Sequence, residues 1–260
     1  MGRQRRKLLG QNFLTCRDVA MIEAEIARGR DVIEIGPGRG ILTHELCRCA
    51  RRVLAVEIDR GLYDGYGERE GNLQLLNADF FAGDIETSSY DMLVSNIPYS
   101  MSSRTLAWLF AHRIEAVLCV QKEFAEHMMA RNGGDRYSRL SVLTSLSFEV
   151  RKVVRVPAGC FRPRPKVDSM VVHMLPKRSD ISTDDSRTIT LLMEHKKKTL
   201  KSAVVDAREG LGLTKEGARE AARGLDGVDE RVFKIAPERL LSIARALNGQ
   251  RVTGSCKPGQ

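Results

Sequence analysis

Short runs of hydrophobic residues alternate with helix-like segments along the first half of the chain. The runs occupy residues 31–36, 52–59, 72–79, 90–96 and 114–121. Each run has the length of a strand buried on both faces. Segment 19–28 and the intervening segments 41–50 and 102–112 space their hydrophobic residues as amphipathic helices do. This alternation predicts a parallel sheet with right-handed helical crossovers.

The pattern changes after residue 150. Two further strands are predicted at 153–157 and 167–175, joined by a proline-rich loop, and residues 176–186 have the composition of a linker. Helical spacing then recurs at 186–207, 214–224 and 237–248. We therefore expect an α/β domain over residues 1–177 and a small helical domain over residues 178–260.

The composition is that of a protein with an ordinary core, with 42% hydrophobic and 29% charged residues in 260. No stretch approaches the ~20 consecutive apolar residues that a membrane helix needs. The N-terminal segment is basic but lacks the apolar centre of a signal peptide. We expect a cytoplasmic protein without a membrane segment.

The cysteines show no metal-binding or disulfide framework. They are Cys16, Cys47, Cys49, Cys119, Cys160 and Cys256. They form no CxxC pair and no Cys/His cluster with zinc-ligand spacing, and the histidines are scattered. We therefore predict no metal site and six reduced thiols.

The positive charge lies mostly outside residues 31–100. This segment holds six arginines, no lysine and twelve acidic residues, a net charge of −6, which leaves +15 for the rest of the chain. Basic clusters occur at 3–7, at 151–178 and, on a predicted helix, at 196–201. Such a distribution favours a polyanionic partner such as nucleic acid. Solvated surface cations are the alternative explanation.

A glycine-rich turn follows the first predicted strand. In the segment Glu34-Ile-Gly-Pro-Gly-Arg-Gly, Gly36, Gly38 and Gly40 allow the backbone to turn sharply and to approach a ligand closely. Dinucleotide sites use the spacing G-x-G-x-x-G, which this turn lacks. The G-x-G-x-G form with an acid two residues ahead favours S-adenosylmethionine (SAM). A turn without any ligand is the alternative.

Two carboxylates follow the next predicted strands. Glu57 ends the second strand at a position from which a carboxylate can accept both ribose hydroxyls of an adenosyl group. Asp79 follows the third strand, where it could accept a hydrogen bond from the adenine amino group. Either acid alone is explained as well by a helix N-cap or a solvated strand end.

The fourth strand ends in Asn96-Ile-Pro-Tyr, which fits methyl transfer to an exocyclic amine. Such an amine is a poor nucleophile, because its lone pair is delocalised into the ring. The Asn96 side-chain oxygen and the Ile97 carbonyl could accept its hydrogens and direct the lone pair at a methyl sulfonium. Pro98 would fix the turn, and Tyr99 would stack on the base. An ordinary Asn-x-Pro turn is the alternative.

The chain resembles the KsgA-type rRNA adenine N6-dimethyltransferases. The resemblance rests on GQNFL at 10–14, EIGPGRGILT at 34–43, VEID at 56–59, NADF at 77–80, NIPYS at 96–100 and FRPRPKVDS at 161–169. HKKKTLKSAV and RVFKIAPERLLSIARAL extend it into the C-terminal part. It implies a Rossmann-like SAM-dependent methyltransferase domain followed by a small helical RNA-binding domain. The sequence departs from the family pattern at Cys16, Ser100 and His195.

The resemblance also implies roles for individual residues. Asn12 and Leu14 would close over the methionine end of SAM, Asn96 would sit between cofactor and target, and Phe161 would form a second aromatic wall for the base. The implied cofactor residues are Gln11, Asn12, Leu14, Gly36, Gly38, Glu57, Ile58, Asp79, Phe80 and Asn96. The implied catalytic residues are Asn96, Ile97, Pro98, Tyr99 and Phe161.

The implied reaction is dimethylation of N6 on two adjacent adenines near the 3′ end of small-subunit rRNA, with a role in ribosome biogenesis. The implied partner is rRNA within a pre-assembled small ribosomal subunit, and we expect a monomer. Alternatives are an adenine N6-methyltransferase of large-subunit rRNA and a ribosome-assembly or nucleic-acid-binding factor with vestigial activity. A nicotinamide-dependent oxidoreductase is disfavoured by the glycine spacing.

Overall fold

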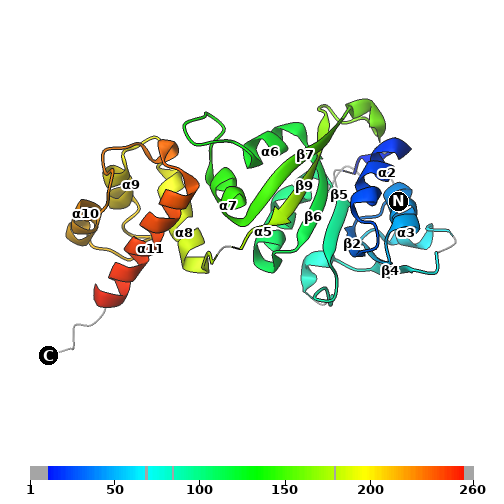
Figure 1. Ribbon diagram of the computed structural model, residues 1–260, viewed down its shortest axis with the longest axis horizontal. Helices are drawn as coiled ribbons and strands as arrows, with labels where there is room; N and C mark the ends of the chain where they lie inside the picture. Colours follow the sequence, from blue (N-terminus) through cyan, green and yellow to red (C-terminus); the bar gives the residue numbers. More distant parts are fainter. Residues whose placement is uncertain (1–10, 68–69, 84, 179, 255–260) are drawn as a thin grey trace. The chain divides into compact units, whose positions relative to one another are not determined.

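The computed structural model describes residues 11–67, 70–83, 85–178 and 180–254 (Figure 1). The basic cluster at 3–7 and Cys256 lie outside the described residues. Contacts divide the chain into two compact units. One unit comprises residues 1–125 and 149–176, and the other comprises residues 126–148 and 177–260.

The first unit is built on a seven-stranded sheet of order β4-β3-β2-β5-β6-β9-β7. The five predicted runs form its parallel part, which consists of β2 (Asp31–Ile35), β3 (Arg52–Glu57), β4 (Leu73–Asn77), β5 (Met92–Asn96) and β6 (Glu115–Gln121). The antiparallel strand β9 (Ser169–Pro176) pairs with β6, and β7 (Phe148–Val156) forms the edge. The predicted Rossmann-like fold is confirmed, with a change of strand order between β2 and β5.

Two helices cover one face of this sheet. Helices α2 (Arg17–Ile26) and α3 (Ile41–Cys49) lie side by side (Figure 1) and share a core with alternate residues of the central strands. These strand residues include Val32, Val94 and Val117. Because side chains alternate along a strand, Glu34, Asn96 and Cys119 must point to the same face as these three valines.

Further helices and 3₁₀ turns connect the strands of the first unit. They comprise α4 (Arg60–Asp64), α5 (Ser102–His112), α6 (Lys122–Met128) and the short 3₁₀ turns η1 (Phe80–Ala82), η2 (Tyr99–Met101) and η3 (Ala158–Cys160). The last residues of α6 already belong to the second unit. The turns η1 and η2 directly follow β4 and β5, so they lie at the carboxyl edge of the sheet.

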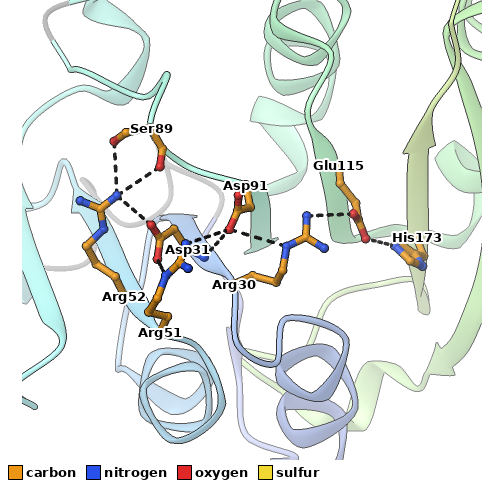
Figure 2. A network of polar contacts seen from close by, with 8 residues as sticks. All are labelled: Arg30, Asp31, Arg51, Arg52, Ser89, Asp91, Glu115 and His173. Carbon is orange, nitrogen blue, oxygen red and sulfur yellow. Dashed lines mark hydrogen bonds and ion pairs between the residues drawn. The ribbon is translucent and has the colours of Figure 1, made fainter.

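A network of ion pairs lies at the opposite, amino edge of the sheet (Figure 2). At its centre Asp31 accepts hydrogen bonds from Arg51 Nε at 2.7 Å and from Arg52 Nη2 at 3.0 Å. The hydrogen bond from Arg51, with the charges of both arginines, holds the pKa of Asp31 below its usual range. Asp91 Oδ2 accepts the backbone N–H of Asp31 at 2.9 Å and thereby ties β5 to β2.

The same network continues across the sheet to β9. Arg30 donates a hydrogen bond from Nη2 to Glu115 Oε2 at 3.2 Å. The Nε atom of the same arginine lies 3.6 Å from Asp91 Oδ2. The other oxygen of Glu115 lies 2.7 Å from His173 Nε2 (Figure 2). Each carboxylate in the network therefore has a basic partner.

A second, two-stranded sheet links distant parts of the first unit. Strand β1 (Phe13–Leu14) pairs with β8 (Phe161–Arg162), with Leu14 opposite Phe161. Beside this pair Cys16 and Cys160 form a disulfide, with Cα atoms 5.1 Å apart. The prediction of six reduced thiols is therefore wrong for these two residues. The two cysteines are 144 positions apart, so no local spacing in the sequence predicts that they pair. The pairing of β1 with β8 brings them together.

The second unit is helical, as predicted for the C-terminal part. It contains α7 (Arg139–Ser147), α8 (Thr183–Glu194), α9 (Leu200–Asp206), α10 (Lys215–Arg223), η4 (Val232–Lys234) and α11 (Pro237–Gly254). The pattern at 186–207 forms two helices instead of one, because Thr199 accepts the backbone N–H of Ser202 and starts α9.

Residues 126–148, which lie within the predicted domain 1–177, make their contacts with this second unit. The buried Tyr137 donates a hydrogen bond from its hydroxyl to the Ile235 carbonyl at 2.9 Å.

Among the described helices, none has the length and apolar character that a membrane-spanning segment requires.

Candidate functional site

A cavity of about 340 Å³ opens at the carboxyl edge of the parallel strands. It is lined by residues that follow β2, β3, β4 and β5, and by the segment that contains β1. The structure brings all the predicted cofactor residues to this one cavity. They are Gln11, Asn12, Leu14, Gly36, Gly38, Glu57, Ile58, Asp79, Phe80 and Asn96.

The glycine turn forms the floor of the cavity after β2. Gly36, Gly38 and Gly40 have φ angles of 68°, 59° and 82°, which residues other than glycine rarely adopt. A Cβ on Gly38 would also lie 3.0 Å from the Phe13 ring. The turn therefore requires glycine for its backbone conformation and for its close approach to the β1 segment.

Glu57 lies at the end of β3 and is held by the backbone. Its Oε2 accepts the N–H of Gly38 at 3.1 Å, and its Oε1 accepts the N–H of Asp59 at 2.8 Å. Burial raises the pKa of Glu57, and these two hydrogen bonds oppose the rise. Each carboxylate oxygen can accept more than one hydrogen bond. Glu57 can therefore still accept hydrogen bonds from the two hydroxyls of a ribose.

Asp79 lies at the start of η1 and acts as its N-cap. Its Oδ1 accepts the N–H of Phe81 at 2.9 Å, and its Oδ2 lies 3.6 Å from Arg104 Nη1. The N-cap explanation is therefore correct for Asp79, although the residue also lines the cavity. Ile58, which is 54% exposed, and the buried Phe80 supply apolar surface in the same part of the cavity.

The Asn96-Ile-Pro-Tyr segment runs from the end of β5 into η2. Asn96 Nδ2 donates to Glu23 Oε2 at 3.3 Å, whereas Asn96 Oδ1 is buried and has no hydrogen-bond partner among the described residues. A buried carbonyl oxygen without a hydrogen-bond partner is costly and uncommon in native structures. This oxygen is available to accept a hydrogen bond from a ligand.

A smaller space of about 10 Å³ adjoins the cavity behind Asn96. Ile97, Tyr99 and Phe161 line it together with Asn12 and Asn96. Tyr99 is held by a hydrogen bond of 2.8 Å between its hydroxyl and Ser169 Oγ. Phe161 is only 3% exposed. The space holds no more than about one water molecule, so a base would have to enter through the main cavity or displace these rings.

Sequence reasoning missed Glu23, which lies behind Asn96 on α2. Its side chain is fully buried, and burial raises its pKa to about 8. Glu34, at the end of β2, is also buried, and burial raises its pKa to about 8 as well. The signal for Glu23 was present, because it occupies an apolar position of α2 between Val19, Ala20 and Ala24.

The prediction of a basic helix at 196–201 is wrong for three of its four lysines: Lys196, Lys197 and Lys198 lie in the turn between α8 and α9, and only Lys201 lies on α9. Two of these cations make intramolecular contacts. Lys196 Nζ donates to the Tyr137 carbonyl at 2.6 Å, and Lys198 Nζ pairs with Asp206 at 2.6 Å. Lys197 and Lys201 are exposed. Over the described residues there is no group of three or more His, Cys, Asp or Glu side chains that could hold a metal ion.

The chain is similar to known rRNA methyltransferases. Residues 2–235 match the family model described as ribosomal RNA adenine dimethylase. The chain is 37% identical to a probable ribosomal RNA small subunit methyltransferase A of Thermococcus gammatolerans, over 91% of this chain and 87% of that protein. It is 36% identical to the protein of the same description from Methanopyrus kandleri, over 93% and 92%.

Two solved structures are similar over nearly the whole chain. A dimethyladenosine transferase from Plasmodium falciparum is 28% identical, with a TM-score of 0.78, over 92% of this chain and 98% of that one. The 23S rRNA methyltransferase ErmE is also 28% identical, with a TM-score of 0.65, over 91% and 100%.

Proposed function

The chain belongs to the ribosomal RNA adenine dimethylase family, and on that premise we propose that it dimethylates N6 of two adjacent adenines near the 3′ end of small-subunit rRNA. Its cofactor is SAM and its reaction class is adenine N6-dimethylation of rRNA. The small ribosomal subunit as substrate, a monomeric state and a cytoplasmic location remain parts of the proposal.

The observation that carries the proposal is Oδ1 of Asn96 at the edge of the cavity, which is buried and has no hydrogen-bond partner in the described part of the chain. An amine that approaches this oxygen needs an acceptor for its hydrogen. The adjacent Ile97 carbonyl offers a second acceptor on the backbone. Two acceptors withdraw the amine hydrogens from the plane of the ring and free the nitrogen lone pair. No metal ion or strong base is required, because the proton leaves after attack.

The polar groups around the cavity fit SAM. Gln11 Oε1, which is buried and unpartnered within the described residues, and the Glu57 carboxylate both present hydrogen-bond acceptors. SAM offers matching donors in its ammonium group, its ribose hydroxyls and its adenine amine. When bound, SAM supplies the electrophilic methyl group of a sulfonium. The chain itself contributes orientation, exclusion of water and polarisation of the amine.

The charge of the chain supports an RNA substrate. The net charge of +15 outside residues 31–100 attracts phosphates, and Lys197 and Lys201 are exposed on the second unit.

Two methyl transfers per adenine require that the target pocket accept an amine that already carries one methyl group. Asn96 and Ile97 then compete for one remaining N–H, so we expect the second transfer to depend more strongly on Asn96.

The test uses small ribosomal subunits that lack the modification, incubated with the protein and methyl-labelled SAM. Product nucleosides are separated by mass spectrometry, with Asn96→Ala in parallel and large subunits as the alternative substrate. We expect N6,N6-dimethyladenosine from small subunits only, and its loss in the variant. Labelling of large subunits alone would overturn the proposed substrate. Binding to small subunits without methyl transfer would indicate an assembly factor instead.

A further inference from the structure

Glu23 is the one carboxyl group on the buried face of α2. That face is otherwise formed by Val19, Ala20 and Ala24. The side chain of Glu23 is 0% exposed. Burial of a carboxyl group is unfavourable unless hydrogen bonds compensate for the lost hydration. A hydrophobic residue at this position would fill the core at lower cost, so Glu23 needs another explanation.

Glu23 contacts the side chain on which methyl transfer depends. Its Oε2 accepts a hydrogen bond from Asn96 Nδ2 at 3.3 Å. Its Oε1 and Asn96 Oδ1 are both buried without a partner among the residues that the structure describes. The contact follows from the register of the sheet, because Asn96 shares the face of Met92 and Val94, which pack in the core under α2.

We propose that Glu23 is a positioning residue, which engages Nδ2 of Asn96 so that Oδ1 faces the amine to be methylated. The inference rests on the proposed function of Asn96. A carboxamide can turn by 180° and exchange its oxygen and nitrogen with little change of shape. The inverted amide would present N–H donors to an amine that also donates. An acceptor on the Nδ2 side excludes this arrangement.

The ionised carboxylate does more than fix the orientation of the amide. A negative acceptor draws the Nδ2 hydrogens and shifts electron density toward Oδ1 through the conjugated amide. Oδ1 then becomes a stronger acceptor for the target N–H. The neutral carboxyl acts in the opposite sense, because its O–H can donate to Oδ1 and stabilise the inverted amide. Methyl transfer should therefore be faster when Glu23 is ionised.

The surroundings of Glu23 set the pH range of this effect. Glu34 faces it from β2 and Cys119 faces it from β6. Burial raises the pKa of Glu23 to about 8, the hydrogen bond from Asn96 lowers it, and the charge of Glu34 raises it. The carboxyl is thus mostly neutral at pH 6.5 and mostly ionised at pH 9. We expect the rate to rise over this interval.

The experiment compares the full chain with Glu23→Gln and Glu23→Met, and uses Glu25→Gln on the exposed side of the same helix as the matched control. Single-turnover methyl transfer to unmodified small subunits is measured from pH 6.5 to 9, at saturating SAM. SAM affinity is measured separately by calorimetry, and folding by thermal unfolding. These readouts separate the chemical step from cofactor binding and from stability.

We expect Glu23→Met to lower the single-turnover rate at pH 9 by about 10- to 100-fold with unchanged SAM affinity. Glu23→Gln retains an acceptor without the charge, so it should match the wild type at pH 6.5 and lose the rise toward pH 9. Glu25→Gln should match the wild type throughout.

Two results would overturn the inference while the proposed function stands. One is an active wild type with an equally active Glu23→Met, and the other is the same pH profile in Glu23→Gln and the wild type. If Glu23→Met does not fold, the profile of the isosteric Glu23→Gln decides. A wild type that binds SAM but transfers no methyl group would overturn the proposed function and this inference with it.

Discussion

The two edges of the parallel sheet differ in how their polar groups are partnered. At the amino edge, Asp31, Asp91 and Glu115 each have basic partners within hydrogen-bond or ion-pair distance (Figure 2). At the carboxyl edge, Gln11 Oε1 and Asn96 Oδ1 are buried around the cavity without hydrogen-bond partners among the described residues. Paired groups stabilise the fold, whereas unpaired acceptors are available to a ligand.

The difference follows from the architecture of the sheet. In open parallel sheets, the loops that follow the carboxyl ends of the strands diverge at the change of strand order and leave a crevice there. At the amino ends of the strands, oppositely charged side chains such as Arg30 and Asp91 lie within ion-pair distance of one another. The comparison therefore predicts that substitutions at the two edges affect different measurable quantities.

The largest effect is expected for Asn96→Ala at the carboxyl edge. Removal of Oδ1 eliminates the acceptor that activates the amine, and we expect the single-turnover rate to fall by about 100- to 1000-fold. SAM affinity should change little, as calorimetry can check. A rate close to that of the wild type would show that the unpartnered oxygen has no role in transfer.

The next largest effect is expected for Glu57→Gln, on cofactor affinity. The amide nitrogen cannot accept a ribose hydroxyl, and it would face the N–H of Gly38 or Asp59. We expect the SAM dissociation constant to rise by about 10- to 100-fold, which corresponds to ~1.4–2.8 kcal/mol. Asp64→Asn, on the exposed surface of α4, is the control. Unchanged affinity in Glu57→Gln would contradict the assignment.

Asp31→Asn at the amino edge should act on stability alone. The substitution removes a carboxylate that pairs with Arg51 and Arg52, and charged hydrogen bonds of this kind contribute about 1–3 kcal/mol. Because the folded pKa of Asp31 lies below its unfolded value, this stabilisation is present at neutral pH and is lost under acid. Urea unfolding at pH 7 and at pH 3 should show a larger difference between the variant and the wild type at pH 7 than at pH 3.

The smallest effect is expected for Glu23→Met on thermal unfolding. The pKa of Glu23 in the folded state, about 8, lies above its unfolded value. The wild type therefore loses stability as the pH rises from about 5 to 9, while the variant is spared this loss. We expect the melting temperature of Glu23→Met to exceed that of the wild type by a few degrees at pH 9 and by less at pH 6. An equal difference at both pH values would contradict a buried ionisable carboxyl.

Local patterns were sufficient to predict the parallel part of the sheet and the edge at which the cavity lies, but not the antiparallel pairing of β9 with β6. Strands β2 to β6 are continuous hydrophobic runs, and Glu57 and Asn96 end two of them, so parallel topology places both residues at one edge. Glycines at 36, 38 and 40 carry a backbone requirement that is visible in the sequence.

Features that depend on distant contacts were not predictable from these patterns. The pairing of Cys16 with Cys160 depends on β1 and β8, which are only two residues long. The buried position of Glu23 is visible in the spacing of apolar residues along α2, but its contact with Asn96 is not, because that contact depends on the register of β5. The association of α7 with the second unit depends on tertiary contacts such as that of Tyr137 with Ile235.

The most direct test of the contrast between the two edges measures rate and stability together in Asn96→Ala and Asp31→Asn. Single-turnover dimethylation of small-subunit rRNA is followed at a temperature at which both variants are folded, and urea unfolding is followed in parallel. We predict loss of transfer with retained stability in Asn96→Ala, and retained transfer with lowered stability in Asp31→Asn. Loss of transfer in Asp31→Asn while it is folded, or normal transfer in Asn96→Ala, would contradict this prediction.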